Sequence, residues 1–274
     1  MNATALSVEE KMLRLQAIIK DMGPMLVAFS GGVDSSFLLA VAAGVLHDQV
    51  VALMTLSPST PPEDVQQAAS LAQSLHVRLL TIQHNELAIP EYAANPTNRC
   101  YFCKNSLYEI CRREAHRLSI HAIADGVNLD DLQDYRPGLR AATEYGIIHP
   151  LVEGQFNKED IRQGSRLLGL STWEKPASPC LASRIPYGTP ITTTMLAQIA
   201  QGESLLRSLG FRELRVRHHG RNVRIEVDSE EFAKFSLSVV DYMRKSMKKI
   251  GFTSVLLDVG GYRSGRLNEG IRVD

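Results

Sequence analysis

Residues 27–36, VAFSGGVDSS, join an apolar run to a helical pattern through a turn of small residues. The run at 27–29 is typical of a strand, and the apolar pattern that resumes at 37–41 is typical of a helix. Backbone N–H groups in a glycine turn can approach an anion closely because glycine has no Cβ. The start of the following helix adds the positive end of its dipole. The turn is therefore suited to bind phosphate.

Apolar, strand-like runs alternate with helical patterns through the N-terminal part of the chain. The expected strands cover 25–29, 49–56, 78–83 and 121–128, with a weaker fifth at 147–151, and the expected helices cover 35–46, 63–75 and 157–170. This alternation predicts an α/β fold built on a doubly wound parallel sheet. Ligands of such a sheet bind beyond the carboxyl ends of its strands, which is where the turn at Ser30 would lie.

From about residue 189 the pattern changes to that of a small α+β domain. It predicts a helix, a hairpin, a second helix and a last strand, at 194–211, 213–220 with 222–227, 230–250 and 253–259. No internal repeat and no low-complexity segment accompanies the change.

The charge balance bears on the partners of the chain. Lys and Arg number 30, as do Asp and Glu, so no global field favours DNA or an anionic membrane. No apolar run approaches the roughly 18–20 residues of a membrane span, and residues 1–20 form a charged amphipathic pattern without a signal-peptide core. We therefore expect a cytoplasmic protein with no nucleic-acid or membrane partner, whose four cysteines are reactive or metal-binding rather than disulfide-bonded.

The glycine turn lacks the lysine of a P-loop, GxxxxGK[ST], and carries Asp34 instead. SGGVDS resembles the SGGxDS signature of the PP-loop ATP pyrophosphatases, which hold the β,γ-pyrophosphate on this loop and cut ATP between its α- and β-phosphates to adenylate a substrate. In that setting Asp34 helps to hold Mg²⁺. The alternative is a tight turn that only joins strand to helix. The resemblance implies a PP-loop domain over 1–188, with 189–274 left for substrate binding or oligomerisation.

Cys100 and Cys103 form a C-x-x-C pair ahead of a helix, and Cys180 lies in a loop of prolines and small residues, KPASPCLASRIPYG. The pair alone fits a zinc half-site, a redox pair or two buried small residues. Cys111 falls on the apolar side of its helix and is expected in the core. The other three thiols fit a [4Fe–4S] cluster with one open iron. A redox disulfide with Cys180 as resolving thiol and unligated thiols remain alternatives.

Acidic side chains cluster after the expected strand at 121–128, within DGVNLDDLQDYRPGLRA. Asp125, Asp130, Asp131 and Asp134 suit Mg²⁺ or ribose contacts, although for Asp134 a solvated acidic turn is an equal alternative. Arg136 follows them and is placed to face a phosphate or a carboxylate.

Arginines recur further along, at Arg184, Arg215, Arg217, Arg221 and Arg224. Arg215 and Arg217 share one face of a strand because side chains alternate with period two. Two guanidiniums on one face form an anion clamp, and the neutral overall charge favours a small phosphorylated or carboxylated substrate over RNA. The alternative is a set of ion pairs with Glu203, Glu213 or Glu226.

SGGVDSS, RCYFCK, DGVNLDDLQDYRPGLRA, KPASPCLASRIPYG, LRSLGFRELRVRHHG and LDVGGYRSGRLN, in this order along almost the whole chain, together resemble the LarE-type sulfur transferases. The resemblance implies an enzyme that uses MgATP to adenylate the carboxylates of pyridinium-3,5-biscarboxylic acid mononucleotide. Sulfur then displaces AMP, and two rounds give the bis-thiocarboxylate precursor of the nickel-pincer nucleotide of lactate racemase. It also implies a homo-oligomer.

The resemblance carries residue roles with it. ATP and pyrophosphate would be bound by Ser30, Gly31, Gly32, Asp34, Ser35, Ser36, Ser57, Gly126 and Asp131. The catalytic set would be Asp34, Cys180, Arg184 and Glu203, with Mg²⁺ on Asp34. The substrate would be bound by Arg136, Arg184, Arg215 and Arg217.

Members of the family differ in their sulfur source. One branch sacrifices a cysteine that would fall here at Pro179, and it lacks the C-x-x-C pair. Another branch has cysteines matching Cys100, Cys103 and Cys180, which resemble ligands of a [4Fe–4S] cluster whose open iron binds hydrosulfide. This chain resembles the second branch, with sacrifice of Cys180 as an alternative. Rival readings are a PP-loop tRNA or nucleoside thiolase, an amide synthetase, and a nucleotide-binding or iron–sulfur sensor.

Overall fold

The computed structural model describes residues 6–133, 136–176, 178–263 and 266–268. The described chain forms two packing units, each built on its own sheet. The first takes its residues from Met1–Ser57, Pro62–Glu86 and Asn98–Ser178, and the second from Pro58–Pro61, Leu87–Thr97 and Pro179–Asp274. Residues 179–188 thus pack with the second unit. The sequence analysis divides the chain after residue 188 instead, and that division into domains stays a prediction.

The sheet of the first unit is parallel throughout and confirms the expected α/β class. Its strand order is β3-β2-β1-β4, and its strands are β1 (Met25–Ala28), β2 (Val50–Leu56), β3 (Arg78–Gln83) and β4 (Ala122–Ala124). In the register, Val27 lies beside both Ala52 and Ala124. The chain moves outward from β1 to β3 and then returns to the other side of β1. The β1/β4 boundary is therefore the topological switch point, where ligands of such sheets bind.

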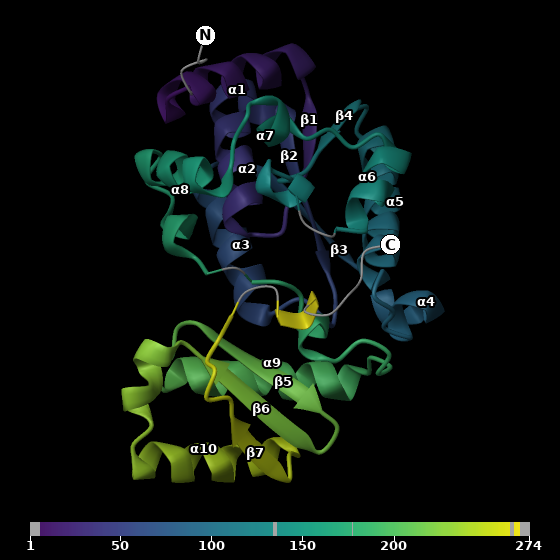
Figure 1. Cartoon of the computed structure of the whole chain (residues 1–274). Helices are drawn as coiled ribbons and strands as arrows, with labels where there is room; N and C mark the ends of the chain where they lie inside the picture. The colour runs from purple at the N-terminus through teal and green to yellow at the C-terminus, as the bar shows by residue number, and fades with distance from the viewer. Residues whose placement is uncertain (1–5, 134–135, 177, 264–265, 269–274) are drawn as a thin grey trace. The chain divides into compact units, whose positions relative to one another are not determined.

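Helices cover both faces of this sheet, because successive strand residues point to opposite sides. Met25 and Val27 face one apolar core, while Leu26 and Ala28 face the other. The first core is closed by α1 (Val8–Met22), α2 (Val33–Leu46), α3 (Pro62–Ser74) and α8 (Lys158–Leu167). The second is closed by α5 (Arg99–Arg117) and α6 (Gly138–Tyr145), on the other side of the strands (Figure 1). The doubly wound arrangement is confirmed.

Two details of the expected sheet are wrong. The fifth strand at 147–151 is reduced to one bridge between Ile148 and Ala124, after which α7 (Pro150–Glu153) begins. Pro150 explains this, because proline donates no ladder hydrogen bond and suits the first position of a helix. The strand expected at 121–128 ends at Ala124, because the Asp125 carboxylate accepts the backbone N–H of Val127 at 3.1 Å and so turns the chain out of the sheet.

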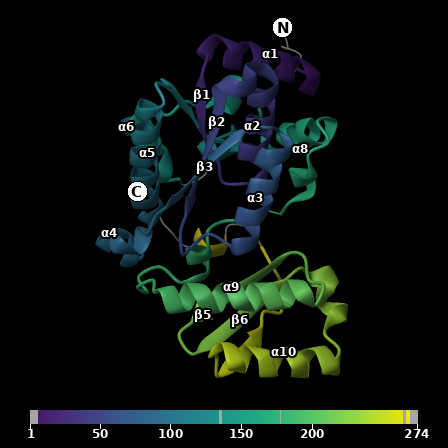
Figure 2. The same cartoon turned by 180° about the vertical axis from the view of Figure 1, so that it is seen from behind.

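The helices of the second unit are α4 (Pro90–Ala93), α9 (Thr193–Ser208) and α10 (Leu237–Ile250), and its strands are β5 (Leu214–His219), β6 (Asn222–Val227) and β7 (Ser254–Leu257). From Thr193 on, the unit has the expected α-β-β-α-β order of helices and strands, and α4 comes from an earlier part of the chain. β5 and β6 are antiparallel, while β6 and β7 are parallel. Figure 2 shows α9 and α10 from the side opposite to Figure 1. Both helices pack on the sheet through an apolar core that includes Leu206, Val216 and Met247.

The helix expected at 230–250 is divided into a 3-10 segment, Ser229–Lys234, and α10. The break lies at Ser236, whose side chain accepts a hydrogen bond from the N–H of Val239 and so caps α10. Among the described residues, no helix combines the length and apolar character needed to cross a membrane.

Candidate active site

The loop that follows β1 is closed by its own serines. The hydroxyl groups of Ser30 and Ser35 lie 3.1 Å apart, and the Ser30 oxygen accepts the N–H of Gly32 at 3.3 Å. Gly32 is also the N-cap of α2 and has no side chain with which to cap it. The first N–H groups of α2 therefore meet no capping side chain, and they point where an anion is favoured.

Two glycines allow the backbone to approach this loop. A Cβ on Gly31, whose φ is +71°, would lie 2.9 Å from the Cβ of Ala68. A Cβ on Gly126 would lie 2.7 Å from the amide nitrogen of Ser35. The segment after β4 thus packs directly on the first turn of α2, so that both loops of the switch point meet. This gives Gly126 a steric reason for its predicted place beside the nucleotide.

Asp34 lies in the first turn of α2 and is held by a lysine that the sequence reasoning missed. Lys158 donates from Nζ to both carboxylate oxygens of Asp34, at 2.7 and 2.5 Å, and Asn128 donates to Oδ1 at 3.3 Å. Lys158 is the first residue of α8, far away in the sequence. A cation at a helix N-terminus opposes the helix dipole. A lysine at the start of the helix expected at 157–170 was therefore the sequence signal that could have drawn attention to this residue.

A second missed lysine contacts the loop from the KPAS segment. Lys175 donates from Nζ to the carbonyl oxygen of Gly31 at 3.0 Å and pairs with Asp64 at 2.9 Å. Ser178 donates to the other oxygen of Asp64 at 2.7 Å. The carboxylate of Asp64 thereby orients the lysine across the phosphate loop.

Asp131 and Arg136, both predicted to bind ligands, form an ion pair of 2.7 Å. Asp131 is nearly buried, and its second oxygen accepts the N–H of Asn128 at 3.1 Å. Burial raises the pKa of Asp131, the charge of Asp34 adds to this, and Arg136 opposes it. The pair lies in the segment that packs on the phosphate loop. Asp134 lies outside the described residues.

Asp125 is buried and is satisfied by the protein itself. It accepts hydrogen bonds from the Tyr108 hydroxyl at 2.6 Å, from His149 Nδ1 at 2.7 Å and from the N–H of Val127 at 3.1 Å. Burial alone would raise the pKa of Asp125, but the hydrogen bond from His149 and the charge of Lys104 lower it overall. The residue therefore ties β4 to α5 and to the start of α7.

The other two serines predicted to bind the nucleotide are Ser36 and Ser57. Ser36 is fully buried in α2, and its N–H is used within the helix, donating to Gly32. Ser57 follows β2, and its hydroxyl donates to the buried carboxylate of Glu86 at 2.8 Å.

The cysteines are divided between the two units. Cys100 and Cys103 lie in the first turn of α5, where a spacing of three places side chains on one helical face. Cys180 belongs to the second unit and precedes the 3-10 turn Leu181–Arg184. Cys111 is buried as expected, and burial raises its thiol pKa to about 12. In the described ranges, no three His, Cys, Asp or Glu side chains gather to hold a metal ion.

In the second unit, Arg184 and Glu203 form a buried bidentate pair. The bonds measure 2.8 Å from Nε and 3.1 Å from the terminal nitrogen, and each side chain is only 1% exposed. Arg184 also donates to the carbonyl oxygens of Pro179 at 2.7 Å and Cys180 at 3.3 Å. Burial alone would raise the pKa of Glu203, but Arg184 lowers it overall. The pair thus holds the backbone around Cys180.

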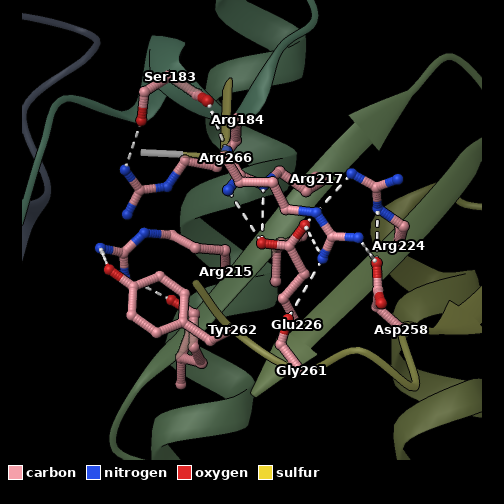
Figure 3. Close-up of polar contacts among 12 residues, drawn as sticks. Ser183, Arg184, Arg215, Arg217, Arg224, Glu226, Asp258, Gly261, Tyr262 and Arg266 are labelled. Atoms are coloured by element: carbon pink, nitrogen blue, oxygen red, sulfur yellow. Dashed lines mark hydrogen bonds and ion pairs between the residues drawn. The ribbon is translucent and has the colours of Figure 1, made fainter. Parts of the chain in front are cut away.

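Arg215 and Arg217 share a face of β5, as the alternation predicts (Figure 3). Arg217 donates twice to Glu226, at 3.0 and 2.9 Å, so the alternative of an internal ion pair applies to it. Arg215 stacks on the ring of Tyr262 at 4.6 Å and donates to its hydroxyl at 3.1 Å. Burial and the charge of Arg184 lower the pKa of Arg215. An anion beside Arg215 would relieve both effects.

Arg224 and Arg266 extend this network by sharing Glu226 and Asp258. Among the described residues, the network includes the carboxylates of Glu203, Glu226 and Asp258 and the guanidiniums of Arg184, Arg207, Arg215, Arg217, Arg224 and Arg266. Guanidiniums gathered in this way suit an anionic ligand.

Comparison with known proteins agrees with this geometry. Residues 8–99 match the NAD synthase family. Together with the phosphate loop at the switch point, this match defines an ATP-using enzyme with a PP-loop domain.

Relatives extend the comparison over the whole chain. It is 43% identical over 262 residues to an uncharacterised Synechocystis protein, covering 95% of this chain and 98% of that one. It is 37% identical over 260 residues to the pyridinium-3,5-bisthiocarboxylic acid mononucleotide synthase of Lactiplantibacillus plantarum, covering 94% of each. An uncharacterised Methanocaldococcus jannaschii protein is 27% identical over 258 residues, covering 93% and 98%. The chain belongs to the family of the Lactiplantibacillus synthase, the LarE-type enzymes, which confirms the resemblance drawn from its motifs.

Proposed function

We propose that this protein is an ATP-dependent sulfur transferase that converts the carboxylates of pyridinium-3,5-biscarboxylic acid mononucleotide into thiocarboxylates. The observation that carries the proposal is the similarity to the Lactiplantibacillus synthase over nearly the whole chain. The phosphate loop and the arginine network support it, because an adenylating enzyme for a nucleotide substrate needs sites for pyrophosphate and for substrate anions.

The first chemical step is adenylation. A substrate carboxylate oxygen attacks the α-phosphorus of ATP, the bond to the β-phosphate oxygen breaks, and pyrophosphate leaves with the electron pair. Ser30, Gly31, Gly32 and Ser35 would hold the pyrophosphate at the start of α2. Asp34 fits Mg²⁺, an ion that proteins usually bind through one or two carboxylates together with substrate phosphates.

The second step replaces AMP by sulfur. Hydrosulfide attacks the acyl carbon, AMP leaves, and the thiocarboxylic acid loses its proton to water. Arg215, beside Tyr262, would bind an anionic group of the substrate. Arg184 and Glu203 would keep the Cys180 backbone in place during attack. A second round at the other carboxylate gives the bis-thiocarboxylate, the precursor that the family resemblance links to the nickel-pincer nucleotide.

On this proposal, Cys100, Cys103 and Cys180 would hold a [4Fe–4S] cluster. The spacing of Cys100 and Cys103 on one face of α5 fits two ligands of such a cluster. When bound, the cluster supplies an open iron that holds replaceable sulfide. The protein's own contribution is to present thiols outside the core, since Cys100 is exposed and Cys103 and Cys180 are partly exposed.

We also propose that the enzyme is a cytoplasmic homo-oligomer. The second unit exposes several large apolar side chains, namely Leu237, Tyr242, Leu256 and Val259. Such side chains often mark contacts between proteins. Light scattering after gel filtration measures the mass, and a monomer across the concentration range would refute this part.

The main test is ATP–pyrophosphate exchange with the dicarboxylate mononucleotide, followed by mass spectrometry of products formed with sulfide or with ammonia. We expect exchange with the mononucleotide and thiocarboxylate formation with sulfide. Exchange that requires tRNA instead, or an amide as product, would refute the proposal. Iron and acid-labile sulfide of anaerobically purified protein test the cluster separately, with roughly four of each expected per chain.

A further inference from the structure

Tyr262 lies in the segment that follows β7 and returns to the sheet of the second unit. Its backbone N–H donates to the carbonyl oxygen of Val227, the last residue of β6, at 2.8 Å. The preceding residue, Gly261, has a φ of +67°, and its N–H donates to the carbonyl oxygen of Asp258 at 3.1 Å. A Cβ on Gly261 would lie 3.2 Å from the Val227 oxygen, so the turn favours glycine. This tight turn fixes the backbone of Tyr262 at the end of β6.

The side chain of Tyr262 contacts Arg215 in two ways (Figure 3). The guanidinium carbon lies 4.6 Å from the ring centroid, and one terminal nitrogen donates to the hydroxyl at 3.1 Å. The other terminal nitrogen donates to the carbonyl oxygen of Leu214 at 2.6 Å, and Arg215 is only 6% exposed. A guanidinium that is already held on an aromatic face loses less side-chain freedom when it binds an anion. The contact therefore fixes the direction in which Arg215 presents its N–H groups.

Arg217, two residues further along the same face of β5, is held by different chemistry. It donates twice to the carboxylate of Glu226, at 3.0 and 2.9 Å. A carboxylate offsets the positive charge that attracts a substrate anion, whereas an aromatic ring and a hydroxyl add no carboxylate charge. Tyr262 therefore orients its arginine without weakening the attraction for an anion.

We propose that Tyr262 is a positioning residue of the substrate site. It holds the guanidinium of Arg215 in the orientation in which this side chain binds an anionic group of the substrate. Tyr262 acts through Arg215 and not on the reacting atoms. The turn that ends at Gly261 thereby becomes part of the substrate site, although it lies outside the strand that carries the arginine. The identity of the substrate rests on the proposed function, whereas the anion site at Arg215 is testable with inorganic phosphate.

The first test measures the orientation of Arg215 without any substrate. Phenylglyoxal, which modifies guanidinium groups, is applied to the full-length chain, and peptide mass spectrometry follows Arg215 with inorganic phosphate as the protecting anion. In the wild type we expect slow modification and protection by phosphate. In Tyr262→Leu, modification should be about fivefold faster and protection should need about tenfold more phosphate, because the stacked orientation is lost. Tyr262→Phe keeps the ring and should lie between the two.

The second test separates positioning from a structural role. In pyrophosphate exchange, Tyr262→Leu should raise the KM for the dicarboxylate mononucleotide about tenfold and change kcat and the KM for ATP much less. Tyr262→Phe should recover most of the KM. A purely structural defect would lower the fraction of active protein, and therefore kcat, and would leave KM unchanged.

The matched control is Tyr145→Leu, which removes the same two kinds of contact in the first unit. Tyr145 lies 5.8 Å from the guanidinium of Arg112 and donates to Asn105 at 3.3 Å. The control should change neither the modification of Arg215 nor the KM for the mononucleotide. Wild-type rates of modification, or wild-type protection by phosphate, or an unchanged KM in Tyr262→Leu would overturn the inference. If the wild type fails to exchange with the dicarboxylate but the phosphate pattern holds, the substrate assignment fails and the role of Tyr262 stands.

Discussion

Glu203→Gln tests the buried pair that holds the Cys180 backbone. The change keeps the shape of the side chain but removes its charge, which leaves the guanidinium of Arg184 inside the protein at 1% exposure without its counter-ion. Breaking such a pair from one side costs about 3 kcal/mol or more. The same carboxylate also pairs with Arg207, which is 38% exposed, and Arg207→Met should cost less than about 1 kcal/mol.

The assay must report the second unit alone. The single tryptophan, Trp173, belongs to the first unit, so its fluorescence does not serve. Hydrogen exchange of peptides from α9 and β5 in increasing urea gives the free energy of unfolding of this unit. Faster alkylation of Cys180 in Glu203→Gln would show that the loop has loosened, because Arg184 also binds the carbonyl oxygen of that residue.

The pH dependence provides a sign check. Burial opposes ionisation of Glu203, but Arg184 lowers its pKa overall in the folded protein. The stabilisation is therefore complete above the unfolded-state pKa of about 4.3 and is lost as the pH falls through the lower, folded value. The difference between wild type and Glu203→Gln should stay constant near neutral pH and shrink in acid. A loss below about 1 kcal/mol at neutral pH, or a difference that grows in acid, would refute the reasoning.

Three further predictions address the first unit. Gly126→Ala places a Cβ 2.7 Å from the nitrogen of Ser35 and should abolish pyrophosphate exchange. Gly44→Ala, in α2 with Ser35 and with nothing within 4 Å of its Cβ, should leave exchange intact, and equal activity of the two variants would contradict the steric argument. Cys111, buried with a thiol pKa of about 12, should resist iodoacetamide at pH 8 while the exposed Cys100 reacts, as read by peptide mass spectrometry. Chelation with EDTA should stop exchange and excess Mg²⁺ should restore it; exchange that survives chelation would argue against the metal.

The sheet could be predicted from sequence because its central strands are buried on both faces and therefore read as continuous apolar runs. The residues at which strands end were harder to predict from the sequence. Pro150 ended the fifth run after one bridge, and the Asp125 carboxylate, which accepts the backbone N–H of Val127, turned the chain away after β4. Both depend on local chemistry that overrides an apolar pattern.

The candidate site was predictable where it lies in a continuous motif, as at Ser30 and Asp34. The lysines were missed because their contacts span 124 residues for Lys158 with Asp34 and 144 for Lys175 with Gly31. For Arg217, alternation gave the face of the strand but not its partner. The register sets Arg217 opposite Arg224, while its hydrogen bonds run diagonally to Glu226.

Asp125 and Gly126 are neighbours in the chain with different attachments. The carboxylate of Asp125 is bound by Tyr108 of α5, the helix whose first turn carries the C-x-x-C pair, and the backbone of Gly126 packs on Ser35 in the phosphate loop. This one peptide unit thus contacts both the phosphate loop and α5, the helix of the C-x-x-C pair. A residue inserted or deleted between β4 and this peptide would displace both together, so the length of this connection is as constrained as the chemistry on either side of it.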